Sequence, residues 1–169
     1  HDIGNHISYE KHHRHSYYLI KHGDLRGFEP EEIAIIALVT RYHRRATPSK
    51  EHEGMGPLTR AQRKTVEVLS AFLRLAETLD RSRHGVIRGL EMRERLGELR
   101  IRVQAVGDAE LEVWAAHRSA DALEVALGRK IVLEKVPYRK GLKSVETELT
   151  RQQPALRGRQ RDRRSVARR

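Results

Sequence analysis

The chain has 169 residues, and 34 Lys and Arg against 23 Asp and Glu give it a formal net charge of +11. With 38% hydrophobic and 34% charged residues it is polar, but its composition does not require disorder and the chain is long enough to bury a core. No Cys is present, which excludes disulfides, thiolate zinc sites and cysteine nucleophiles. No apolar run approaches the roughly 20 residues that span a bilayer, so we expect a cytoplasmic protein without a membrane partner.

The positive charge is concentrated at the C-terminal end. Residues 151–169 contain eight Arg and one Asp, or +7, whereas the other 150 residues carry +4. A run of like charges with few apolar residues predicts a disordered basic tail, which we place at residues 137–169. A tail that contacts polyanions is the alternative interpretation.

The N-terminal part predicts three helices. The first covers residues 12–22 and ends before Gly23, and the second runs from about Glu31, after Pro30 in its first turn, to about residue 45. After a loop containing Pro and Gly, Thr59 caps a third helix that reaches about residue 82. These segments predict an all-helical unit over residues 1–90.

The apolar pattern then changes its period. Residues 99–105 alternate as in a half-buried strand, and residues 111–115 are predicted to be its hairpin partner. A short helix over residues 119–128 and a third strand over residues 131–136 complete a β-β-α-β module at residues 97–136. The predicted fold class is therefore α+β.

Two polar residues lie on helix faces that are otherwise apolar. His43 follows Val39 at i+4, and Asp80 follows Ala76 in the same way. A buried His is often a hydrogen-bonded core residue, and a buried carboxylate needs a cation, which is either a metal ion or an arginine such as Arg81. In addition, six of the ten His lie within residues 1–22, and such a stretch is either solvated surface or a source of metal ligands.

The order of the motifs is more specific than any single residue. They are His1-Asp2-Ile3-Gly4, residues 12–20 with the sequence HHRHSYYLI, Gly27-Phe28, residues 37–45 ending in RYHRR, and residues 73–81 with the sequence LRLAETLDR. Over about residues 1–135 the chain resembles the C-terminal HD-type region of the exopolyphosphatase and guanosine pentaphosphate phosphohydrolase (Ppx/GppA) family. The resemblance implies an N-terminally truncated HD-type helical domain whose phosphatase site lies in upstream actin-like domains, so we expect this chain to be a fragment.

The HD-type pattern also implies site residues. The implied ligands of a divalent cation (Mn, Mg, Fe or Zn) are His1, Asp2, His15, His43 and Asp80. A basic face for phosphate oxygens is predicted from His12, His13, Arg14, Arg41, Arg44 and Arg45, with a solvated surface as the alternative.

Three functions are compatible with these observations. The first is an accessory region of a polyphosphate or guanosine-pentaphosphate phosphatase that aids polyanion binding and forms a homodimer, inactive without the upstream domains. The second is an autonomous metal-dependent HD phosphohydrolase that acts on a nucleotide or another phosphoester. The third, a nucleic-acid protein, is disfavoured because basic and aromatic residues do not alternate as in a single-strand platform.

Overall fold

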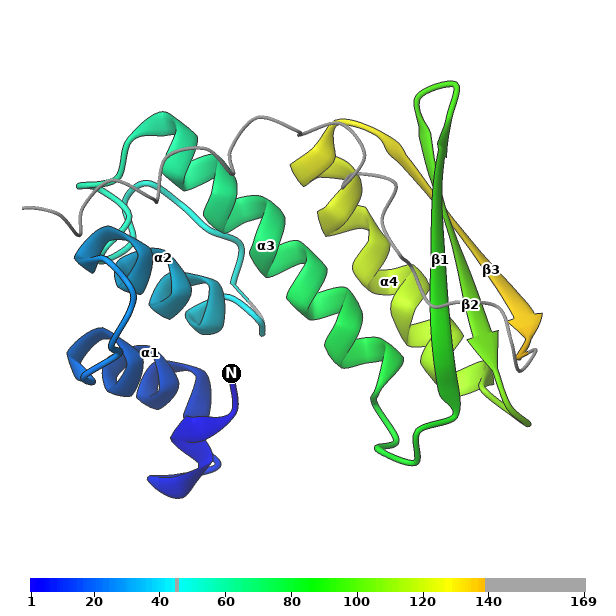
Figure 1. Ribbon diagram of the computed structural model, residues 1–169, viewed down its shortest axis with the longest axis horizontal. Helices are drawn as coiled ribbons and strands as arrows, with labels where there is room; N and C mark the ends of the chain where they lie inside the picture. Colours follow the sequence, from blue (N-terminus) through cyan, green and yellow to red (C-terminus); the bar gives the residue numbers. More distant parts are fainter. Residues whose placement is uncertain (45, 139–169) are drawn as a thin grey trace, which may run out of the picture.

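A computed structural model of the chain describes residues 1–44 and 46–138. Its elements are a 3-10 helix η1 (Ile3–His6), helices α1 (His12–His22), α2 (Pro30–Arg41) and α3 (Arg60–Leu79), strands β1 (Ile87–Arg95) and β2 (Glu98–Ala105), helix α4 (Glu110–Leu127) and strand β3 (Lys130–Pro137). This is the predicted α+β fold class (Figure 1). Beyond Tyr138, the predicted basic tail lies outside the described residues. Among the described helices, none has both the length and the apolar character needed to cross a membrane.

The helix ends follow from local chemistry. Glu29 and Glu32 form a capping box around Pro30 at the start of α2, and Thr59 and Gln62 form another at the start of α3. α1 has the predicted bounds, because Gly23 leaves the helical conformation. By contrast, α2 ends at Arg41, four residues earlier than predicted.

The sheet has the order β1-β2-β3, with β1 antiparallel and β3 parallel to β2. α4 is the crossover that a parallel pair requires, so the predicted β-β-α-β order is confirmed. The assignment of residues 111–115 to a strand was wrong, because they form the first turns of α4. The missing strand is β1, which begins inside the unit predicted to be all-helical and ends in the gap between it and the predicted module.

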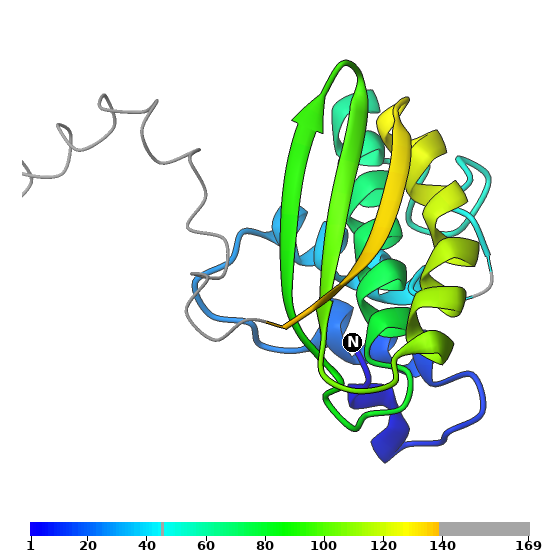
Figure 2. The same cartoon turned by 90° about the vertical axis from the view of Figure 1, so that its right-hand side faces the viewer.

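Two apolar clusters meet on α3. Leu75 and Leu79 belong to the cluster that α3 forms with the sheet and α4, whereas Val66 belongs to the cluster with α1, α2 and the following loop. In Figure 2 the sheet is seen face-on as one layer, and α3 and α4 lie behind it as the other. The single helix α3 thus carries both the helical part and the sheet part.

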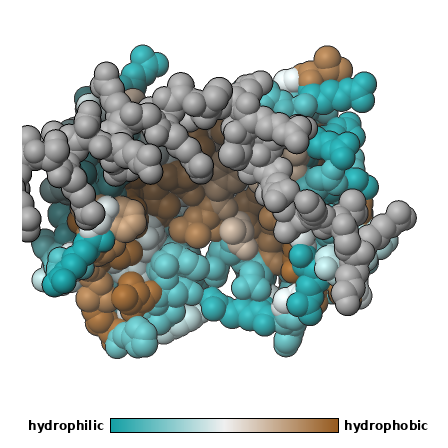
Figure 3. Space-filling model, in the orientation of Figure 1, coloured by the Kyte–Doolittle hydropathy of each residue, from teal (hydrophilic) through white to brown (hydrophobic). Residues whose placement is uncertain are grey.

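The outer face of the sheet is charged. Ion pairs join Glu91 to Arg102, and Arg100 to Glu98 and Glu134. On the face shown in Figure 3, hydrophilic side chains accordingly dominate the right-hand side, where the sheet lies, and apolar side chains gather across the middle. The sheet therefore buries only one of its faces, against α3 and α4.

Candidate metal and anion site

The position of the first two residues depends on a close approach between η1 and α1. The Gly4 amide donates a hydrogen bond to Ser16 Oγ (2.8 Å), and Gly4 is buried. A Cβ at Gly4 would collide with the backbone of His12 and Ser16, so only glycine allows this contact. Because η1 is seated on α1, Asp2 lies beside the C-terminal end of α2.

Two buried histidines face each other next to Asp2. His12 Nδ1 donates to the Tyr9 carbonyl (3.1 Å), and His43 Nδ1 donates to the Thr40 carbonyl (2.6 Å). Carbonyl oxygens only accept hydrogen bonds, so in both neutral rings the unprotonated nitrogen is Nε2. These two Nε2 atoms are 3.1 Å apart. Two lone pairs at this distance repel each other unless a proton or a metal ion lies between them.

Asp2 brings a carboxylate to the same point. Its Oδ1 lies 3.3 Å from His12 Nε2 and 3.9 Å from His43 Nε2. Its Oδ2 accepts a hydrogen bond from Arg83 Nη2 (2.8 Å). Burial by itself raises the pKa of Asp2, but the Arg83 hydrogen bond and the charges of both histidines outweigh burial, and the net pKa is lowered. Asp2 therefore stays ionised near neutral pH.

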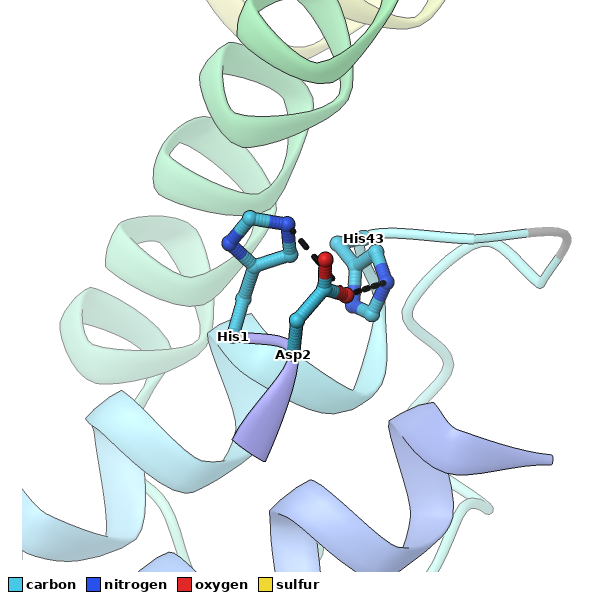
Figure 4. Close-up of side chains that lie close together, drawn as sticks. All are labelled: His1, Asp2 and His43. Atoms are coloured by element: carbon cyan, nitrogen blue, oxygen red, sulfur yellow. Dashed lines mark ion pairs between the residues drawn. The ribbon is translucent and has the colours of Figure 1, made fainter. Parts of the chain in front are cut away.

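His1 completes the cluster from the other side. Its Nε2 lies 3.5 Å from Asp2 Oδ1 and 2.9 Å from Glu77 Oε2. One ligand atom from each of His1, Asp2 and His43 lies within 4.8 Å of the others, and Figure 4 shows these side chains converging. Burial lowers the pKa of His43, which favours the neutral ring that binds metals. The donor set of imidazole nitrogens and a carboxylate fits a divalent transition metal.

Two of the five predicted ligands lie apart from this cluster. Asp80 is exposed at the C-terminal cap of α3, so the expected burial of its carboxylate was wrong. Ala76, which precedes Asp80 on the same helix face, is exposed as well, and the buried face of α3 carries Leu75 and Leu79 instead. His15 is half-buried on α1 and is not among the residues whose ligand atoms converge.

The cluster lies in the wall of a cleft of about 650 Å³. Arg44, Arg74 and Arg81 line it, and none of the three forms an ion pair with a described residue. Arg74 donates instead to the carbonyls of Tyr42 (2.8 Å) and Ala46, and burial lowers its pKa. Arginines without a carboxylate partner, together with hydroxyl groups in the same wall, make the cleft suitable for an anion.

The predicted phosphate-binding residues are divided between this cleft and its surroundings. His12 and Arg44 line the cleft. His13 is half-buried, and burial is the main cause of its lowered pKa. Nearby positive charges lower this pKa further, and they belong to His12, Arg14, Arg44 and Arg41. Arg14 is exposed, and Arg41 pairs with Glu53 (3.3 Å) and lies over the Tyr17 ring. Arg45 lies outside the described residues.

Sequence analysis missed the contribution of α3 to the cleft. Arg74, Glu77 and Thr78 of α3 line it, and so does Arg81 just after the helix, at spacings of three and four residues along the chain. Such a spacing places them on one face of a helix, and this polar stripe was visible in the sequence. Its significance was hidden because a polar helix stripe is normally a solvated surface.

The model of the Ppx/GppA phosphatase family for domain III matches residues 1–114. The chain belongs to this family. The match confirms the resemblance to the C-terminal region of Ppx/GppA phosphatases. It includes η1, α1, α2, α3, β1 and β2, so the cluster and nearly the whole cleft lie inside the matched part of this Ppx/GppA phosphatase region.

Proposed function

We propose that this Ppx/GppA region is an accessory part of a polyphosphate or guanosine-pentaphosphate phosphatase. It binds the polyanionic substrate in the cleft and contributes to dimerisation, and the main catalytic domains belong to another part of the same protein. The observation that carries the proposal is the cleft with three arginines, Arg44, Arg74 and Arg81, that lack acidic partners among the described residues. A chain of phosphates supplies the missing negative charge.

The binding part is tested by titrating the chain with polyphosphate and with guanosine pentaphosphate. A charged hydrogen bond contributes about 1.5–3 kcal/mol, so Arg44→Ala and Arg81→Ala should each weaken binding by roughly tenfold or more. Arg95→Ala is the matched control, because it removes the same charge from the far end of β1. Equal losses in all three variants would contradict binding in the cleft and indicate only attraction to net charge.

The accessory part is tested by phosphate release. We expect no hydrolysis of polyphosphate by this chain alone, with or without added divalent metal. Release at an enzymatic rate would overturn the accessory role.

A second candidate function is an autonomous metal-dependent phosphohydrolase of the HD type. It is favoured by the two Nε2 lone pairs of His12 and His43, which converge with the Asp2 carboxylate. These three residues, together with His1, would hold a divalent cation. When bound, such a cation lowers the pKa of a water ligand and polarises a phosphoryl oxygen. Arg44 and Arg81 would orient the phosphate in the cleft, and the Tyr9 and Thr40 carbonyls hold the two imidazoles in the required tautomer.

Metal analysis of the purified chain tests this second function. Under it, one Mn, Fe or Zn per chain is expected, and Asp2→Asn and His43→Ala should lose it. His15→Ala and Asp80→Asn are the controls, because both side chains lie outside the converging cluster and should leave the metal bound. A chain that stays metal-free after incubation with each ion would exclude the second function and leave the first intact.

A further inference from the structure

α4 carries apolar side chains on two opposite sides. Its buried side packs on α3 and the sheet through Ala116, Leu123 and Ala126. Its outer side exposes Leu111 (52%), Trp114 (58%) and Val125 (81%). With 3.6 residues per turn, residues 111, 114, 118, 121, 122 and 125 share one stripe along the helix. The exposed fractions of Leu111, Trp114 and Val125 show that no described residue covers them.

The stripe contains both a protruding side chain and a recess. Val125 lines an apolar cavity of about 260 Å³, together with Ala122 and Ala126 of α4, Ala71 of α3, and Pro48. Trp114, the only Trp of the chain, projects from the same stripe three turns earlier, about 16 Å along the helix axis. A large exposed aromatic side chain and an apolar recess at this separation form a surface that is complementary to itself.

The charges between them are also complementary. Arg118 lies over the Trp114 ring (5.0 Å), and among the described residues neither Arg118 nor Asp121 has an ion-pair partner. When two α4 helices are placed antiparallel with Arg118 opposite Asp121 of the second copy, Trp114 falls opposite Val125 of that copy. A two-fold axis then relates the two copies, so each of these contacts occurs twice, as it must in an isologous interface.

We propose that the outer stripe of α4 is the homodimer interface, in which Trp114 of each copy enters the apolar cavity beside Val125 of the other. This inference rests on the dimerisation part of the proposed function and names its surface. The interface matches known interfaces in composition, since aromatic and arginine side chains form the energetic centre of most of them. The antiparallel register is set by the Arg118 and Asp121 pairs.

The experiment is sedimentation equilibrium of the full chain, combined with Trp114 fluorescence. The wild-type chain should dimerise, and its emission should move to shorter wavelength with rising concentration, because dimerisation buries the only indole. Val125→Glu and Trp114→Ala should each raise the dimer dissociation constant roughly 30-fold or more. Leu96→Ala is the control: it removes an exposed side chain (93%) from the hairpin tip and should change nothing.

A charge exchange tests the register. Arg118→Glu and Asp121→Arg should each weaken the dimer, and the double variant should restore it, because the exchanged charges again face each other. Circular dichroism confirms that each variant is folded. A monomeric wild-type chain, or a dimer that survives both Val125→Glu and Trp114→Ala, would overturn the proposal. Polyphosphate binding is measured separately, so failure of this interface is distinguishable from failure of the cleft.

Discussion

Each of the two buried imidazoles, His12 and His43, is held by a backbone carbonyl, and this decides which ring nitrogen is free. The Thr40 carbonyl occupies His43 Nδ1 and the Tyr9 carbonyl occupies His12 Nδ1, so the only free nitrogens point at Asp2. Burial opposes protonation of His43 more strongly than its acceptors favour it. His43 therefore keeps its Nε2 lone pair available at neutral pH.

The lowered pKa of His43 predicts a pH-dependent stability. The ring ionises at a lower pH in the folded chain than its ordinary value of 6.5, so the unfolded chain binds more protons as pH falls through 6.5. The free energy of unfolding should therefore decrease from pH 7.5 to pH 5.5. His43→Asn, whose amide can still donate to Thr40, should show a smaller decrease. Urea unfolding with a chelator present measures both, and equal pH dependence in the two proteins would contradict the assignment.

At the scale of elements, η1 and α1 act as one unit that presents Asp2 to α2. Their contact depends on the absence of a side chain at Gly4. The rest of the cluster comes from the ends of α2 and α3, and Arg74 ties the segment after α2 to α3 through two carbonyls. The site is therefore sensitive to how these ends are packed.

Gly4→Ala should separate η1 from α1. Overpacking of this kind costs about 1–3 kcal/mol of unfolding free energy. Under the second candidate function, the variant should also lose the metal binding that depends on Asp2. Gly56→Ala is the control, because its Cβ would meet only the Lys50 carbonyl at 4.0 Å. Thermal unfolding and binding titrations measure both effects, and retention of stability and binding by Gly4→Ala would show that the close approach is unimportant.

The two elements that were wrongly predicted have a common cause. β1 carries an irregular register between Ile87 and Gly89, so its apolar residues are spaced by three before they alternate. The first turns of α4 show the opposite, since Leu111, Val113 and Ala115 alternate like a strand while Leu111 faces outward. In a strand with a bulge, or in a helix that is apolar on two sides, the spacing of apolar residues no longer indicates whether the segment is a strand or a helix.

At the scale of the whole molecule, α3 joins the two apolar cores. Leu75 is 3% exposed and packs in the cluster with the sheet and α4, on the same helix as Val66 in the other cluster. Loss of packing in one core therefore loosens the helix on which the other depends. We expect the described residues to unfold as one cooperative unit.

Leu75→Ala should lower the unfolding free energy by about 2–5 kcal/mol. The transitions followed by far-ultraviolet circular dichroism and by Trp114 fluorescence should remain coincident, because both parts depend on α3. Leu69→Ala, which truncates an exposed side chain (46%) of the same helix, should change the unfolding free energy by less than about 0.5 kcal/mol. Separate transitions would show that the two parts unfold independently.

Most of the formal positive charge comes from residues 151–169 and not from the residues that line the cleft. Removing residues 151–169 lowers the net charge from +11 to +4. We expect this truncation to abolish salt-sensitive binding to nucleic acid and to leave polyphosphate binding in the cleft within about twofold. Filter binding at two salt concentrations measures both. Nucleic-acid binding that survives truncation would revive the nucleic-acid function.

The sequence by itself determined the family, the α+β class, the bounds of α1, the Pro30 start of α2 and the Thr59 cap of α3, because these depend on local motifs and short-range hydrogen bonds. It also singled out His1, Asp2 and His43. Only the tertiary structure decided that His12 belongs with them, that Asp80 does not, and that Arg74 of α3 and Arg81 just after it line the cleft. These contacts join residues that are far apart in sequence, and they form because the cores on α3 and the close approach at Gly4 bring the helix ends together.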